Sequence, residues 1–184
     1  MSSYEFETHE PVDLYVELGK GDIIVTATDT TATTVEVEGR EPERVEVRQD
    51  GRQVSVIGPK SNRGLFGGEP QYVVTISLPT RSNAVVKTGS GDLEIGYASE
   101  GVSMSTGSGD MRIRHASKGK VTAKGASGDV LVGIPAGTPV WTDLTTVSGD
   151  ISSDLHGAGQ PEPGADYVEL RAKTVSGDIH LTEV

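Results

Sequence analysis

The sequence predicts an all-β protein, a single-domain β-solenoid with two short strands in each repeat. One observation is a tripeptide, Ser-Gly-Asp, which recurs five times between residues 88 and 181. Four of the five are followed by two apolar residues in alternation, and the one ending at Asp150 is followed by Ile151 alone. The other is that apolar and polar residues also alternate before each tripeptide, with no helical periodicity anywhere. Such a repeat, here called a rung, can bury its apolar face only against neighbouring rungs.

The spacing of the tripeptides supports stacked rungs. Their aspartates are separated by 18, 19, 21 and 28 residues, and the last step contains a Gly/Pro-rich insert at 157–166 whose ten residues account for the excess. A coil that returns in parallel to the same sheet is expected to be right-handed, like a β-helix. An antiparallel sandwich is the competing architecture, but a sandwich does not require residue types to recur in columns.

Residues 1–27 are expected to form the first rung. Apolar residues alternate on both sides of Lys20-Gly21-Asp22, in the same phase as around Ser-Gly-Asp. Residues 28–80 interrupt the pattern and predict a β-meander with a hairpin, because Asp50-Gly51 is a strong two-residue turn signal between alternating valines. Within this section, 60–71 reads as a polar loop in which the apolar pair Leu65-Phe66 is explained by no alternation.

Residues 81–184 are expected to form the regular rungs, interrupted by the insert 157–166. Equivalent residues should stack in columns, and threonines in one column can hydrogen-bond to each other. That column contains Thr88, Thr106, Gly125, Thr146 and Thr174. The final rung, 174–184, would then present unpaired backbone groups, which predicts self-association or binding of a protein partner through this end or a sheet face. Alternatively, 28–80 folds back to shield an end.

Composition excludes several classes of partner. The net charge of −11 argues against nucleic acid and anionic lipid, and no apolar window is long enough for membrane insertion. The first residues have neither a basic head nor an apolar run, so a cytoplasmic location is expected. The chain has no cysteine, and therefore no disulfide or thiolate metal site. No cofactor is predicted.

The Ser-Gly-Asp corner has a structural and a functional interpretation. Structurally, glycine supplies a positive φ, and the aspartate and serine accept N–H groups of their own turn. Functionally, a calcium ion could bridge stacked carboxylates that otherwise repel each other. The second corner of each rung has no aspartate, so the structural interpretation is preferred. The calcium candidates are Asp92, Asp110, Asp129, Asp150 and Asp178.

No catalytic constellation is recognisable, and the sequence predicts no enzyme. The four histidines, at 9, 115, 156 and 180, lack metal-ligand spacing, and nucleophile-elbow, zinc and phosphate-loop motifs are absent. Trp141 lies at an outward phase, where it either covers a sheet edge or stacks on a ligand.

These features resemble the bacterial putative-adhesin domain family of unknown function. The resemblance covers residues 6–184 and rests on the Gly-Asp rung near the N-terminus, the strand ending in Leu78-Pro79, and the serial Ser-Gly-Asp rungs. It implies a β-solenoid without enzymatic activity. Three function classes follow: a structural or interaction protein that serves as scaffold or binds a partner, a cell-envelope adhesin or stress-response protein, and a carbohydrate-active β-helix enzyme. The first is preferred, because outward positions show no cluster of carboxylates.

Overall fold

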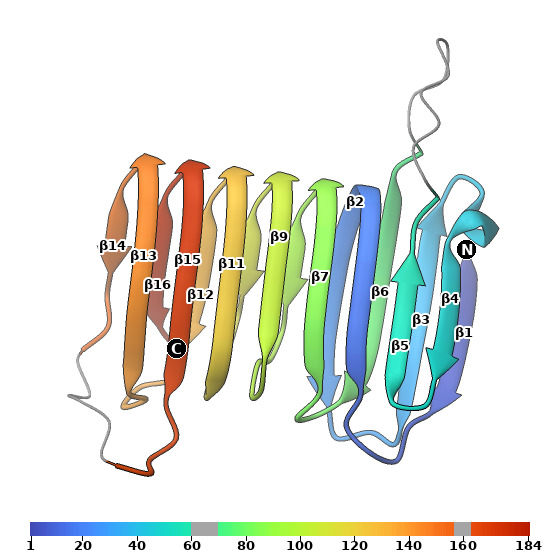
Figure 1. The fold of residues 1–184 in the computed structure, drawn as a ribbon, viewed down its shortest axis with the longest axis horizontal. Helices are drawn as coiled ribbons and strands as arrows, with labels where there is room; N and C mark the ends of the chain where they lie inside the picture. Colours follow the sequence, from blue (N-terminus) through green and yellow to red (C-terminus); the bar gives the residue numbers. More distant parts are fainter. Residues whose placement is uncertain (60–69, 157–162) are drawn as a thin grey trace.

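The computed structural model describes residues 1–59, 70–156 and 163–184, and it confirms the all-β solenoid (Figure 1). Apart from one 3₁₀ turn at Pro42–Arg44, the regular elements of the described residues are all strands. They are β1 (Ser2–Glu7), β2 (Asp13–Thr28), β3 (Ala32–Gly39), β4 (Glu46–Asp50), β5 (Gln53–Ile57), β6 (Tyr72–Pro79), β7 (Asn83–Ser90), β8 (Leu93–Ile95), β9 (Val102–Ser108), β10 (Met111–Ile113), β11 (Gly119–Ser127), β12 (Val130–Ile134), β13 (Val140–Ser148), β14 (Ile151–Ser153), β15 (Val168–Ser176) and β16 (Ile179–Glu183). The pair Leu65-Phe66 lies outside the described residues.

Two sheets face each other along the length of the molecule. The front sheet, nearest the viewer in Figure 1, has the order β13-β15-β11-β9-β7-β2-β5-β4, and the back sheet has the order β14-β16-β12-β10-β8-β2-β6-β3-β1. Each regular rung places one strand in each sheet, and rungs pair in parallel and in register. Strand β2 is long enough to contribute to both sheets, which confirms two strands per rung from the first rung onward.

The core lies between the sheets and consists of stacked columns of apolar side chains. One front column runs Val16, Val86, Met104, Ala123 and Ala172, all buried, and ends at the half-buried Leu144. The back column runs Ile23, Leu93, Met111, Val130 and Ile179, and ends at Ile151. Alternation in the sequence therefore identified the core correctly, because inward positions repeat every second residue in a strand.

The irregular section caps one end of the solenoid. Strands β5 and β6 pair in parallel with β2 and together act as an extra rung. Beyond them, β4 pairs antiparallel with β5 in the front sheet, and β3 pairs antiparallel with β6 in the back sheet. Strand β1 then pairs antiparallel with β3. The expectation that 28–80 folds back over an end is confirmed, as is the hairpin at Asp50-Gly51. One boundary differs: residues 2–7 belong to this cap and not to the first rung.

At the other end, the last two rungs exchange places. The rung β15/β16 lies between β11/β12 and β13/β14, so the penultimate rung in sequence is the terminal rung in space (Figure 1). The prediction that residues 174–184 form the open end is therefore wrong, and β13 and β14 form it instead. The repeat spacing could not reveal this exchange, because spacing reports the length of a rung and not the identity of its neighbour.

The threonine column exists, but its hydrogen bonds differ from the expected ones. In space its order is Thr88, Thr106, Gly125, Thr174, Thr146. Instead of bonding to each other, the threonines donate to glycine carbonyls of the neighbouring rung, as in Thr106 Oγ1 to Gly91 O at 3.2 Å. Thr88, Thr174 and Thr146 make the equivalent bonds to Gly21, Gly128 and Gly177. Each bond satisfies a hydroxyl at the rim of the core.

Candidate functional site

The glycine of each Ser-Gly-Asp corner has a positive φ, as predicted, with values from 127° at Gly128 to 152° at Gly149. A second requirement was not predicted. A Cβ built on Gly109 would lie 2.1 Å from the carbonyl oxygen of Gly91, because the neighbouring rung passes directly against the corner. Conformation and close approach therefore both demand glycine.

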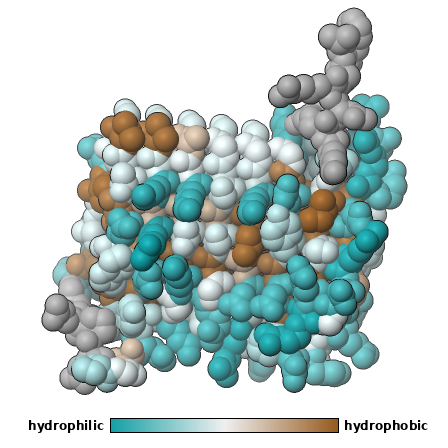
Figure 2. All heavy atoms as spheres, in the orientation of Figure 1, coloured by the Kyte–Doolittle hydropathy of each residue, from teal (hydrophilic) through white to brown (hydrophobic). Residues whose placement is uncertain are grey.

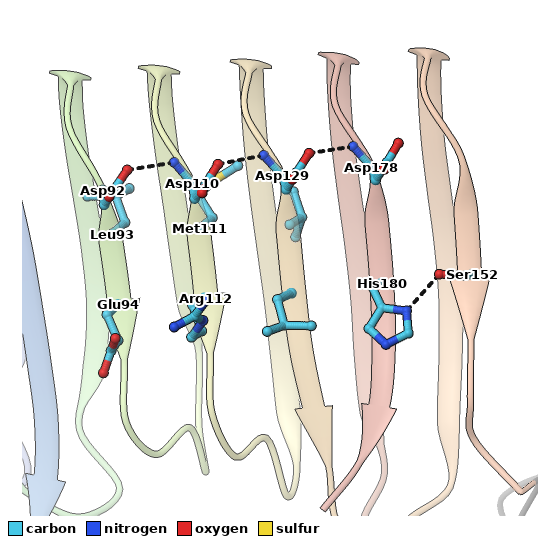
Figure 3. Close-up of a pocket in the computed structure, with 12 residues that line it drawn as sticks. Asp92, Leu93, Glu94, Asp110, Met111, Arg112, Asp129, Ser152, Asp178 and His180 are labelled. Atoms are coloured by element: carbon cyan, nitrogen blue, oxygen red, sulfur yellow. Dashed lines mark hydrogen bonds between the residues drawn. The ribbon is translucent and has the colours of Figure 1, made fainter.

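The five predicted calcium candidates come together in one ladder along this corner, and Figure 3 shows four of them, Asp92, Asp110, Asp129 and Asp178. Except at Asp150, where the ladder ends, each carboxylate accepts a hydrogen bond from the backbone N–H of the next rung's aspartate, not from its own turn as expected. Asp92 Oδ1 accepts from Asp110 N at 2.8 Å, and Asp110 Oδ1 accepts from Asp129 N at 2.9 Å. The ladder starts at Asp22 and continues through Asp178 to Asp150. One oxygen of each bonded carboxylate thus holds two rungs together, which is a structural role.

A shallow groove of about 460 Å³ lies on the back sheet beside this ladder. Its floor carries Glu94, Arg112, Leu131 and His180 in one row, and Ser152 lies within 2.6 Å of His180 Nδ1 (Figure 3). In the described part of the chain, no group of three or more His, Asp or Glu side chains is arranged to hold a metal ion. The calcium assignment itself stays a prediction. The other histidines lie apart from the groove. His180 contacts Ser152 through Nδ1 and the Asp154 carboxylate through Nε2, at 3.3 Å, so a hydroxyl, an imidazole and a carboxylate meet at the edge of the groove. All three side chains are exposed or half-exposed.

The open end formed by β13 and β14 is the second candidate. Of the exposed large apolar side chains, three belong to this rung: Trp141 at 46%, Val147 at 77% and Ile151 at 47% exposure. Ile151 points inward, and within the part of the chain that the structure describes no further rung covers it. Val175 on the neighbouring rung is also exposed, and apolar atoms gather at the corner above β13 and β15 in Figure 2. Val147 and Val175 lie side by side there, because the residues on either side of them are paired between β13 and β15, and exposed apolar surface marks interaction sites.

The outer face of the front sheet is the third candidate. Trp141 lies there, as its outward position in the alternation of apolar and polar residues predicted, and the Arg171 guanidinium is 5.4 Å from the centre of its ring. At the far side of the same face, Lys87 lies 5.2 Å from the ring centre of Tyr15. The Tyr15 hydroxyl donates to the Glu17 carboxylate, and this hydrogen bond raises the pKa of Tyr15. In the sequence, Lys87 and Arg171 stand out only as polar residues in the alternation, because the register between rungs is needed to see which aromatic ring each one contacts.

Among the described residues, no helix is long and apolar enough to cross a membrane. Comparison with curated proteins finds no match.

The solved structure of one bacterial protein shares the fold. A putative cell adhesion protein from Clostridium sporogenes aligns with a TM-score of 0.71 at 14% identity, covering 100% of this chain and 99% of that one. A putative adhesin from Bacteroides fragilis aligns with a TM-score of 0.44 at 13% identity, covering 98% and 96%. The Toastrack DUF4097 family matches residues 12–183. This span includes nearly the whole solenoid, so the chain belongs to the Toastrack DUF4097 family.

Proposed function

We propose that this protein is a non-enzymatic interaction module that assembles through the open end of its solenoid. The observation that carries the proposal is the unpaired rung β13/β14, whose inward side chains are left half-exposed. An unpaired strand edge is a template for another strand, and natural proteins usually protect such edges.

The two ends of the molecule differ in this protection. At the capped end, β1 carries two glutamates and β4 carries Glu46, Arg48 and Asp50. Charged side chains on an edge strand discourage pairing with another chain. At the open end, β13 has Asp143 as its only charged residue, and β14 has none. The open edge therefore has the composition of a strand that accepts a partner.

A second copy of this chain is the occupant that fits best. Both sheets end at the same rung, so covering the core requires a partner with two strand edges at the spacing of the sheets. The open end of another copy has this geometry. A two-fold axis normal to the sheets would pair β13 with β13 and β14 with β14, both antiparallel, and join Leu144 and Ile151 of the two copies in one core. The pair would be closed, because a cap stands at each far end.

Charge limits how strongly the pair forms. Each copy carries −11, so two copies repel each other, and salt screens this repulsion at separations beyond about 8 Å at physiological ionic strength. We therefore expect dimerisation to increase with salt, the reverse of an association driven by ion pairs.

Light scattering coupled to size exclusion, over a range of protein and salt concentrations, tests the proposal. The Thr142→Lys/Ile151→Lys variant places charges on both open edges and changes the net charge from −11 to −9. It should be monomeric even though its global repulsion is smaller. Both positions are exposed or half-exposed, and lysine stems tolerate such sites.

The matched control is Ser3→Lys/Gln49→Lys, which makes the same charge change on the edges of the capped end. This control should dimerise like the unmodified chain, or slightly better. A monomeric unmodified chain under every condition, or an edge variant that still dimerises, would overturn the proposal and leave a different protein as the occupant.

Adhesion is the second candidate function, because the Clostridium sporogenes protein of the same fold is a putative cell adhesion protein. It differs from the first in location, since an adhesin acts outside the cell. The cytoplasmic location expected from the N-terminal sequence stays a prediction, and cell fractionation with protease accessibility distinguishes the two.

A further inference from the structure

A row of lysines crosses the outer face of the front sheet. Lys87 on β7 and Lys124 on β11 both align with Ser105 on β9, and Lys124 aligns with Lys173 on β15. All three lysine side chains are exposed. Neighbouring strands lie about 4.8 Å apart, so the row extends over three strand spacings. Figure 2 shows this face, with hydrophilic side chains distributed across it.

These cations are poorly matched by acidic groups. From β7 to β15 the outer face carries one carboxylate, Glu169, which lies 3.8 Å from Lys120 and 3.1 Å from Arg171. Within the described residues, no carboxylate lies within ion-pair distance of Lys124 or Lys173. The strip from β7 to β15 is therefore positive, and it is bordered by Glu17 on β2, which aligns with Lys87, and by Asp143 on β13, which aligns with Arg171. The molecule as a whole carries −11 and places its aspartate ladder at the corner.

The arrangement of Lys124 and Lys173 costs stability in the isolated chain. They are direct neighbours on paired strands, and like charges in that position are destabilising. An anion lying along the row would neutralise both charges and remove this repulsion. Charge complementarity thus selects a ligand with several negative groups in a line.

The surroundings of the row favour sugar rings as the carrier of those charges. Trp141 is exposed at the end of the face with Arg171 against its ring, and its flat apolar surface suits the C–H face of a sugar. Hydroxyl side chains occupy positions between the cations, among them Ser103, Ser105 and Thr122. They can donate to and accept from sugar hydroxyls.

We propose that this basic track, defined as Lys87, Lys124, Lys173, Arg171 and Trp141, binds a linear anionic glycan. The sugar stacks on Trp141, and its acidic groups pair with Arg171 and the lysines. A duplex nucleic acid fits less well, since it carries one charge per about 1.7 Å, far denser than lysines one or two strands apart. The track lies on a sheet face, so this inference does not depend on assembly through the open end.

Polygalacturonate is a suitable probe, and Trp141 supplies the readout because it is the chain's single tryptophan. At low salt, polygalacturonate should change the tryptophan fluorescence in a saturable way, and added salt should reverse the change. Neutral dextran should have no effect. The Lys124→Gln/Lys173→Gln variant should bind about tenfold more weakly, from the loss of two exposed ion pairs.

The control variant is Arg40→Gln/Arg112→Gln, which changes the net charge equally but lies on the cap and the back sheet. It should bind within about twofold of the unmodified chain, if binding uses the track and not net charge. The inference is overturned if polygalacturonate gives no signal, if dextran gives the same signal, or if the control weakens as much as the lysine variant. Equal or tighter binding of polyglutamate or a single-stranded oligonucleotide would also overturn it.

Discussion

Replacing Gly109 with alanine is expected to destabilise the solenoid strongly, for two reasons that the structure quantifies. The residue has φ near 138°, which L side chains rarely adopt, and such strain costs about 1–3 kcal/mol. The new Cβ would also lie 2.1 Å from Gly91 O, where ordinary contact begins at 3.4 Å, so the two rungs must separate by about 1.3 Å. That separation strains the hydrogen bond from Gly91 N to Ser108 O, now 2.8 Å, and costs roughly a further 1–3 kcal/mol.

The total of about 2–6 kcal/mol should lower the melting temperature by roughly 5–20 °C, measured by circular dichroism. Gly137→Ala is the matched control. Gly137 also has a positive φ, 76°, but nothing lies within 4 Å of its Cβ position, so only the backbone cost of about 1–2 kcal/mol applies. If the Gly109 and Gly137 variants melt within a degree or two of each other, close approach between rungs is not what requires glycine at the corner.

Three further predictions concern single groups. Asp110→Ala should cost about 1 kcal/mol in urea unfolding, because it removes the acceptor for Asp129 N–H, whereas Asp110→Asn keeps an acceptor oxygen, removes like-charge repulsion and should be neutral or stabilising at low salt. Tyr72→Phe should raise the melting temperature by a few degrees, since the buried Tyr72 hydroxyl has no hydrogen-bond partner among the described residues and leaving it unpaired costs about 1–3 kcal/mol. Millimolar calcium should leave the melting temperature unchanged relative to chelator, because one oxygen of each bonded aspartate already accepts a hydrogen bond from the next rung. A calcium site would add about 2.7 kcal/mol to the free energy of unfolding at a calcium concentration a hundredfold above its Kd, which a thermal melt would detect.

Local patterns in the sequence predicted most of the fold. Alternation identified the inward residues, such as Val86 and Met104, because strand geometry fixes which face each residue occupies. The Ser-Gly-Asp tripeptides identified the corners, and Asp50-Gly51 identified the hairpin. In both cases a single glycine takes a positive φ, and this preference can be recognised from the residue type alone. The family resemblance was confirmed as well.

Relations between rungs could not be predicted in the same way. The exchange of the last two rungs could not be read from the sequence, because both orders of the rungs satisfy the same alternation. The aspartate ladder and the Thr106–Gly91 bond likewise join residues whose proximity is set by stacking alone. The alignment of Lys124 with Lys173 was hidden for the same reason, since it places residues 49 positions apart on adjacent strands.

The order of the rungs determines which end is open, and cysteine cross-linking measures it directly. The chain has no cysteine of its own, so engineered pairs report without interference. Ser127 and Ser176 are paired on adjacent strands, as are Ser176 and Ser148, whereas Ser127 and Ser148 are separated by an intervening strand. Disulfides require Cα atoms within about 7 Å, and two strand spacings exceed this. The structure predicts that Ser127→Cys/Ser176→Cys oxidises readily and that Ser127→Cys/Ser148→Cys does not; the opposite result would show that the rungs stack in sequence order and that residues 174–184 form the open end.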